Sequence, residues 1–139
     1  MNDMSCFEKT KYKLIQEISC GGFSNVYSAT YVNSKYAIKI MKHYHKKNFE
    51  RECGILSLLN HQFICKFVED IHVHSRNAIV MEFVNGVELY DVIYHANRRL
   101  SYLQTKFLSA CVLSALIYLH DMSIIYRDIK PENIIVTYD

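Results

Sequence analysis

The segment that decides the fold is Tyr126-Arg127-Asp128-Ile129-Lys130-Pro131-Glu132-Asn133, which holds four charged side chains and the only proline of the chain. An apolar run, Ile134 to Val136, follows it and is typical of a short strand. The simplest interpretation is a solvated turn that precedes this strand. The spacing of its carboxylate, ammonium and amide groups favours a chemical role instead.

This segment resembles the catalytic loop of eukaryotic protein kinases, H-R-D-x-x-x-x-N, with Tyr126 in place of the histidine. Phosphoryl transfer requires a carboxylate that accepts the proton of the substrate hydroxyl, and an amide oxygen that holds Mg²⁺ against the phosphates of ATP. The resemblance implies that Asp128 is the catalytic base and that Asn133 is the metal ligand. Lys130 implies a serine/threonine-type enzyme, in which it neutralises charge on the transferred phosphoryl group.

A second segment, Ala37-Ile38-Lys39, resembles the kinase V-A-I-K strand, whose lysine binds the α and β phosphates. In isolation it could be an ordinary strand with a solvated lysine. Lys39 needs a glutamate from the next helix, and Glu50 and Glu52 are the candidates. At about 100° per residue, Glu52 lies on the apolar stripe of that helix and Glu50 lies nearly opposite. We therefore expect Glu52 to pair with Lys39, because an unpaired carboxylate on a core-facing stripe is costly.

The segment S-C-G-G-F-S-N-V, residues 19–26, resembles the kinase phosphate-binding loop G-x-G-x-x-G-x-V. It keeps only the middle glycine, Gly21, while Ser19 and Ser24 occupy the two outer positions. Glycine allows close backbone approach and unusual φ angles, so serine is expected to loosen the phosphate contacts or reshape the loop. Without the other motifs this segment would be an ordinary hairpin. The resemblance implies phosphate-side contacts from Ser19, Gly21, Gly22 and Ser24.

Residues 79–84 resemble the last small-lobe strand and the hinge that binds adenine. The resemblance implies that Met81 is the gatekeeper and that backbone groups of Glu82 and Val84 bond the adenine. It also implies an apolar sandwich around the ring and a ribose contact, from Val26, Ala37, Ile135 and Glu88. The alternative for each apolar residue is ordinary core.

Alternating apolar residues over 12–41, with turn signals at Gly21-Gly22 and Asn33-Ser34, predict three strands. Two further strands are predicted near 64–72 and 78–84. Helical spacing predicts helices over 48–59, 88–97 and 101–120, the last opened by a capping box of Ser101 and Gln104. These elements indicate an α+β fold class, and the resemblance implies a protein kinase-like fold. It has a five-stranded antiparallel small lobe with one helix over 1–84 and the start of a helical large lobe over 85–139.

The long helix carries an apolar stripe formed by Leu103, Phe107, Cys111, Ala115, Tyr118 and Leu119. Its uncharged run, residues 107–120, is shorter than the ~20 residues that span a membrane, so we expect a buried helix and no membrane partner. The resemblance places its packing partners later in the domain. We therefore also expect part of its apolar surface to be uncovered.

The composition excludes several classes of protein. Half of the residues are apolar and the formal net charge is +2, which fits one folded domain and gives no reason to expect a nucleic acid partner. The densest basic patch, Lys42 to Lys47, is interpreted as a solvated loop. The N-terminus shows no secretory pattern and no myristoylation signal, so a cytoplasmic location is expected. The five cysteines, never spaced C-x-x-C, predict neither disulfides nor a zinc site, and are interpreted as reduced, mostly buried thiols.

Two histidine pairs, His43 with His45 and His72 with His74, have the i, i+2 spacing that places both imidazoles on one face of a strand. Metal binding would require this geometry. No third ligand cluster accompanies either pair, so exposed strand histidines are the favoured interpretation.

Together these motifs indicate a serine/threonine protein kinase that uses ATP and Mg²⁺ and acts on protein substrates. Tyr126, the run Phe107 to His120 and the Gly21-Gly22-Phe23 turn resemble the AGC group, near the cyclic-nucleotide-dependent kinases. In that group carboxylates at the positions of Glu88 and Glu132 face a substrate arginine; alternatively Glu88 contacts only ribose. The D-F-G segment would follow Asp139, so the chain as given is expected to be inactive. The alternative function is a pseudokinase-like nucleotide-binding or interaction module. The oligomeric state is not predicted.

Overall fold

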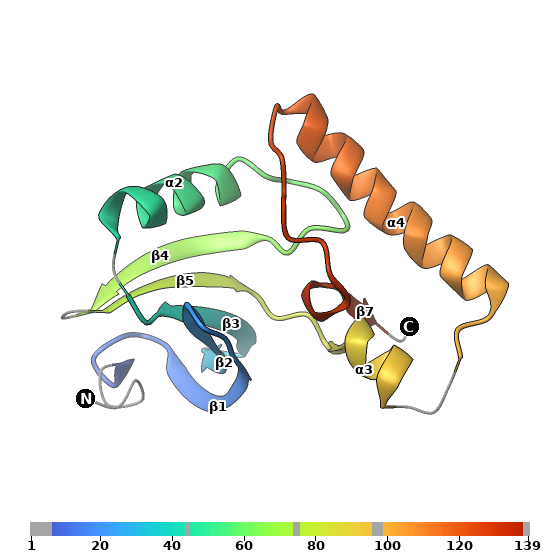
Figure 1. Cartoon of the computed structure of the whole chain (residues 1–139). Helices are drawn as coiled ribbons and strands as arrows, with labels where there is room; N and C mark the ends of the chain where they lie inside the picture. The colour runs from blue at the N-terminus through green and yellow to red at the C-terminus, as the bar shows by residue number, and fades with distance from the viewer. Residues whose placement is uncertain (1–6, 44, 74–75, 96–98, 138–139) are drawn as a thin grey trace. The chain divides into compact units, whose positions relative to one another are not determined.

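The chain folds into two compact units, which are described separately. The structure is a computed structural model and describes residues 7–43, 45–73, 76–95 and 99–137 (Figure 1). Unit 1 comprises Met1–Asn60 with Cys65–Phe83, and unit 2 comprises His61–Ile64 with Val84–Asp139. The sequence prediction divides the chain after Val84. The structure assigns Val84 and residues 61–64 to the second unit instead.

Unit 1 is built on a five-stranded antiparallel sheet, as predicted. Its strand order is β1-β2-β3-β5-β4, so β3 lies at the centre and β1 and β4 are the edges. The loops between β1, β2 and β3 fall at the two predicted turn signals. The strands are β1 (Lys13–Cys20), β2 (Ser24–Tyr31), β3 (Ser34–Met41), β4 (Phe67–Val73) and β5 (Arg76–Glu82).

The two faces of this sheet bury different clusters, because successive side chains of a strand point to opposite faces. The larger cluster consists of Phe7, Tyr12, Leu14, Tyr27, Ala29, Ile38, Ile40, Val73, Ala78 and Val80. The other face is covered by α2 (Lys46–Leu56), whose Phe49 and Cys53 pack with Ile79 (Figure 1). The predicted helix, 48–59, is therefore shifted by two or three residues at each end.

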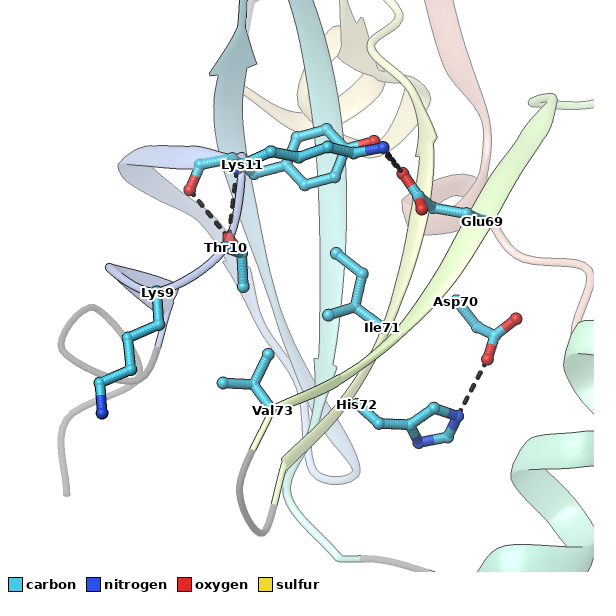
Figure 2. A pocket seen from close by; sticks show the side chains of 9 residues that line it. Lys9, Thr10, Lys11, Glu69, Asp70, Ile71, His72 and Val73 are labelled. Atoms are coloured by element: carbon cyan, nitrogen blue, oxygen red, sulfur yellow. Dashed lines mark hydrogen bonds and ion pairs between the residues drawn. The ribbon is translucent and has the colours of Figure 1, made fainter.

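A short N-terminal segment closes the larger cluster. Phe7 is only 1% exposed, and Thr10 Oγ1 donates a hydrogen bond of 2.9 Å to the Phe7 carbonyl. Figure 2 shows the Lys11 side chain reaching Glu69 of β4, with 2.7 Å between Nζ and Oε1. The Tyr12 hydroxyl also donates to Glu69. Hydrogen bonds from Lys11 and Tyr12 lower the pKa of Glu69, so this carboxylate stays ionised and ties the segment to the sheet edge.

Unit 2 contains a two-stranded ribbon, of which the sequence predicted the second strand but neither the first strand nor the pairing. Strand β6 (Gly86–Glu88) pairs with β7 (Ile135–Thr137), nearly fifty residues later in the chain. Gly86 is required for this pairing, because a Cβ atom there would lie 2.5 Å from the carbonyl oxygen of Val136. The ribbon therefore joins the start of α3 (Leu89–Tyr94) to the segment after the short 3-10 helix η1 (Pro131–Asn133).

The long helix α4 (Tyr102–Asp121) is capped at both ends. Ser101 Oγ accepts from the Gln104 N–H at 3.2 Å and Gln104 Oε1 accepts from the Ser101 N–H at 2.9 Å, which confirms the predicted capping box. At the other end Ser123 adopts a φ of 59°, and the N–H groups of Ser123 and Ile124 bond the carbonyls of His120 and Leu119. This is a Schellman motif, which fixes the residue at which the helix stops.

Most of α4 is not covered within the described residues. Leu119 is buried, and the His61 ring stacks on Tyr118 at 5.0 Å between centroids. Leu103 and Phe107 are 73% and 67% exposed, so their predicted burial is wrong, whereas the expectation of uncovered apolar surface on this helix is confirmed. The physical reason is that the 61–64 segment reaches only the C-terminal half of the helix. By length and mean hydropathy alone, α4 could span a membrane.

The loop between β2 and β3 yields a stability prediction. Val32 is 79% exposed and has a φ of 54°, a conformation that β-branched residues disfavour and that a two-residue hairpin loop reserves for glycine. We expect Val32→Gly to raise the free energy of unfolding by about 1 kcal/mol, measured by urea denaturation. Asn33→Gly is the control, because Asn33 has a negative φ and should gain nothing. Equal effects from both substitutions would contradict strain at Val32.

Candidate active site

The strand register gathers the predicted nucleotide contacts of unit 1 on one face of the sheet. Val26 of β2 lies opposite Lys39 of β3, and Ala37 lies opposite Met81 of β5. Ser19 pairs with Val26 across β1 and β2. Since directly paired residues point to the same side, these side chains share the face that α2 covers in part.

On this face Lys39 forms an ion pair with the helix above it. Its Nζ lies 2.7 Å from Glu52 Oε1, and the two side chains are 29% and 35% exposed. Glu50 points to solvent and makes a longer contact of 3.7 Å with Lys46 on the surface of α2. The helical periodicity therefore selected the correct glutamate.

A cavity of about 550 Å³ adjoins this ion pair. The ion pair lies in its wall, and the remaining lining comes from the tip of the 19–26 loop, the end of β3 and the first turns of α2. These lining residues are Phe23, Met41, His43, His45, Asn48 and Phe49. The predicted phosphate-binding lysine and its partner thus lie in the wall of this cavity, together with the polar side chains of His43, His45 and Asn48.

The loop between β1 and β2 is closed by backbone hydrogen bonds. The Gly21 N–H donates to the Ser24 carbonyl at 2.9 Å, and the Lys42 N–H donates to the Phe23 carbonyl at 2.9 Å. Neither Gly21 nor Gly22 has a positive φ, and an added Cβ on Gly22 would meet open space. In this conformation the loop therefore does not use the special backbone freedom of its glycines.

The predicted hinge is partly occupied by contacts within the protein. The Glu82 N–H donates to the Lys66 carbonyl at 3.0 Å, and the Glu82 carboxylate accepts from the Lys66 N–H at 2.8 Å. These two bonds use the N–H group and the carboxylate of Glu82. Its backbone carbonyl is therefore the group that could accept a hydrogen bond from an adenine amino group. Val84, the second predicted hinge residue, belongs to unit 2.

In unit 2 the predicted catalytic loop folds around Asp128. Asn133 Nδ2 donates to the Asp128 carbonyl at 2.9 Å and to its Oδ2 at 2.8 Å, and Lys130 Nζ lies 3.2 Å from the same Oδ2. Arg127, just before it, has a φ of 65°, a left-handed conformation rare for this residue type. Hydrogen bonds from Asn133 and then Lys130 lower the pKa of Asp128, so the carboxylate is ionised at neutral pH.

The orientation of the Asn133 amide follows from its partners. Both Asp128 atoms are acceptors, so the amide nitrogen must face them. The amide oxygen is not used by either bond. An amide oxygen is among the ligands that Mg²⁺ accepts, so the orientation of Asn133 is compatible with its predicted role as the metal ligand.

Glu88 and Ile135, predicted to contact ribose and adenine, lie directly opposite each other across β6 and β7. Burial raises the pKa of Glu88, and the nearby carboxylates of Asp91 and Glu132 raise it further. The sequence did not indicate Asp91 as part of this acidic group. Its position on the first turn of α3 brings it there.

Other features of the described residues do not form a second chemical site. A cavity of about 580 Å³ lies between the N-terminal segment and β4, and in its wall Lys11 pairs with Glu69 while Asp70 Oδ2 lies 3.0 Å from His72 Nε2 (Figure 2). No cluster of three potential metal ligands occurs in the part of the chain that is described, and His74 lies outside it.

The cysteines differ in part from expectation. Cys53 is buried, and burial raises its pKa to about 11, which keeps the thiol protonated. Cys20 and Cys65 are exposed, so the interpretation of mostly buried thiols is wrong for these two. Cys6 lies outside the described residues.

The arrangement of a strand lysine, a helix glutamate and a D-x-K-x-x-N loop agrees with comparison to known proteins. The protein kinase domain family matches residues 12–139. This chain belongs to the protein kinase family. The match runs through α4, so this apolar helix is accounted for as a helix of the kinase domain.

Curated relatives of this kinase chain are serine/threonine or related protein kinases. The maternal embryonic leucine zipper kinase of Danio rerio is 33% identical over 137 residues, which cover 92% of the chain. The serine/threonine-protein kinase KIPK2 of Arabidopsis thaliana is 34% identical over 137 residues, again 92% of the chain. The chain spans only 20% and 14% of the lengths of these two proteins.

The fold of this kinase chain is also similar to a solved structure. The crystal structure of Rad53 1-466 in complex with AMP-PNP aligns with a TM-score of 0.85 and 29% sequence identity. The alignment covers 97% of this chain and 38% of the Rad53 chain. The kinase-like fold class predicted from the sequence is therefore confirmed.

The two ion pairs of α2 give a matched test of the kinase lysine. In double-mutant cycles of Lys39→Met with Glu52→Gln, we expect a coupling of about 1 kcal/mol in the free energy of unfolding, because both groups are partly shielded from water. Lys46→Met with Glu50→Gln should give about 0.3 kcal/mol, as for an exposed i, i+4 pair. Equal couplings would mean that the Lys39 pair has no special environment.

The catalytic loop yields a prediction about ionisation. Asn133→Ala removes the hydrogen bonds that favour the charged form, so the pKa of Asp128 should rise toward its ordinary value. Carboxyl-carbon NMR titration would measure this shift. Glu132→Gln is the control, since Glu132 makes no hydrogen bond to Asp128 among the described contacts, and the pKa should barely move. An unchanged pKa in Asn133→Ala would contradict the described geometry.

Proposed function

We propose that this chain is the nucleotide-binding and catalytic-loop part of a serine/threonine protein kinase, which transfers the γ-phosphate of Mg-ATP to protein substrates. The observation that carries the proposal is the Asp128 loop, in which Lys130 and Asn133 both contact one carboxylate oxygen. In the proposed reaction Asp128 orients the substrate hydroxyl and accepts its proton, while Lys130 neutralises charge on the transferred group.

The proposed nucleotide binding is based on residues of unit 1. Lys39, held by Glu52, would bind the α and β phosphates, and the face shared by Val26, Ala37 and Met81 would receive the adenine ring. The Rad53 structure was determined with AMP-PNP, an ATP analogue, which supports adenine nucleotide as the ligand class. Asn133 would hold the Mg²⁺ ion, which supplies charge neutralisation at the phosphates.

We further propose a preference for arginine near the phosphorylated residue, as in the AGC group that the sequence resembles. Burial raises the pKa of Glu88, and the nearby carboxylates of Asp91 and Glu132 raise it further. A guanidinium would relieve this repulsion and could form several charge-assisted hydrogen bonds at once.

The alternative is a nucleotide-binding module without catalytic activity. The serines at positions 19 and 24 favour it, because they replace two glycines of the phosphate-binding motif. The intact contacts of Lys39 and of Asp128 favour a catalytic origin. Both alternatives predict that the chain as given transfers no phosphate at a useful rate, so the decisive test of activity needs a chain that contains a D-F-G segment.

Nucleotide binding tests the proposal on the present chain. Calorimetric titration should show ATP binding that Lys39→Met weakens at least tenfold, because the substitution removes a phosphate contact and leaves Glu52 unpaired. Asp128→Asn is the matched control, since the proposal gives Asp128 a role in transfer and none in adenine binding. Failure of the wild-type chain to bind ATP would overturn the proposed function.

Substrate preference can be tested on a longer chain that includes a D-F-G segment. A peptide library should select serine or threonine preceded by arginine, and Glu132→Ala should reduce this selection at least tenfold because it removes one charged partner. Turnover should vanish in Asp128→Ala. Selection of acidic or proline-containing peptides, or arginine selection unchanged by Glu132→Ala, would refute the preference.

A further inference from the structure

Lys42 has contacts that a solvated loop residue would not need. It follows β3 directly, and its backbone N–H donates to the Phe23 carbonyl at 2.9 Å. Its side chain turns back to the same loop, where Nζ lies 2.7 Å from the Gly21 carbonyl and 3.5 Å from Cys20 Sγ. The interpretation of residues 42–47 as a solvated loop is wrong for Lys46 and Lys47, which begin α2, while Lys42 lies in the loop and contacts three residues of the predicted phosphate loop.

These contacts fix the direction of one peptide unit. The Gly21 carbonyl and the Gly22 N–H belong to the same planar trans peptide, so they point in opposite directions. Because the ammonium of Lys42 holds the carbonyl, the Gly22 N–H points away from Lys42. Among the described residues, this N–H makes no hydrogen bond. An outward N–H group in a loop is the kind of donor that binds phosphate oxygens.

The two serines of the loop give a reason why a side-chain contact that holds the loop in place would help phosphate binding. Glycines at the two outer positions would let the backbone fold closely over phosphates, and here Ser19 and Ser24 occupy those positions. A loop held in one conformation before binding loses less conformational entropy when the ligand arrives. By holding the loop in one conformation before binding, the Lys42 tether can therefore offset part of the phosphate affinity that the two serines are expected to remove.

We propose that Lys42 is a positioning residue that clamps the 20–23 loop and aims the Gly22 N–H at a nucleotide phosphate. This inference rests on the proposed function, since it assumes that the loop binds phosphate. It adds to the proposed nucleotide site one residue, Lys42, that belongs neither to the glycine-loop motif nor to the Lys39–Glu52 ion pair. Lys42 itself need not touch the ligand.

Hydrogen exchange tests the clamp without any ligand. In Lys42→Met the backbone bond from residue 42 to Phe23 remains, but the tether to Gly21 is lost. Mass spectrometry should show several-fold faster exchange in peptides covering residues 19–26, with Lys42→Arg close to the wild type. Lys46→Met removes the same charge from the surface of α2 and should leave this exchange unchanged. Equal exchange in the wild type and Lys42→Met would overturn the clamp.

Nucleotide titration tests what the clamp is for. Lys42→Met should weaken ATP and ADP binding by about two- to fivefold, the range expected for one exposed charged contact. Adenosine, which has no phosphate, should bind all variants alike, and Lys42→Arg should restore most of the ATP affinity. A parallel loss of adenosine affinity would show general damage and overturn the phosphate role. If the wild type binds no nucleotide, the proposed function and the phosphate role both fail, while the exchange experiment still decides whether the clamp exists.

Discussion

The antiparallel register of β3 between β2 and β5 is the constraint on which the rest of unit 1 depends. It places Lys39 opposite Val26 and Ile79, and the pleat then sends Ile38 and Ile40 to the other face. A slip of one residue would exchange these sets, burying the Lys39 ammonium in the large apolar cluster. The same register therefore decides which face is core and which face can meet a charged ligand.

The sequence predicted best those features that depend only on residues close together in the chain. Glu52 was distinguished from Glu50 because the 3.6-residue helical period is a property of neighbouring residues. The capping box of Ser101 and Gln104 is likewise contained in four positions. These features need no knowledge of what the rest of the chain does.

The part that could not be predicted depends on contacts far apart in the sequence. The pairing of β6 with β7 joins residues nearly fifty positions apart. The apolar run at β7 indicated a strand, but β6 is a three-residue strand with too little alternation to be recognised. Phe7 is a single aromatic residue without a periodic neighbour, so nothing in its local sequence indicates burial. The hydrogen bond from the Lys42 side chain to the Gly21 carbonyl could not be predicted either, because it depends on how the end of β3 lies against the loop between β1 and β2. The sequence could predict that the nucleotide-binding residues share one face of the sheet and that the catalytic residues share one loop. The chemical role of each of these residues stays a prediction.

The division of unit 1 into two apolar clusters has a consequence for how firmly α2 is held. Only Phe49 and Cys53 of this helix are buried, and the larger cluster on the opposite face does not include them. Moving α2 off the sheet would expose these two side chains and Ile79 of β5 beneath them, at a cost on the order of 5 kcal/mol. The Lys39–Glu52 ion pair therefore depends on a helix that few buried side chains hold against the sheet.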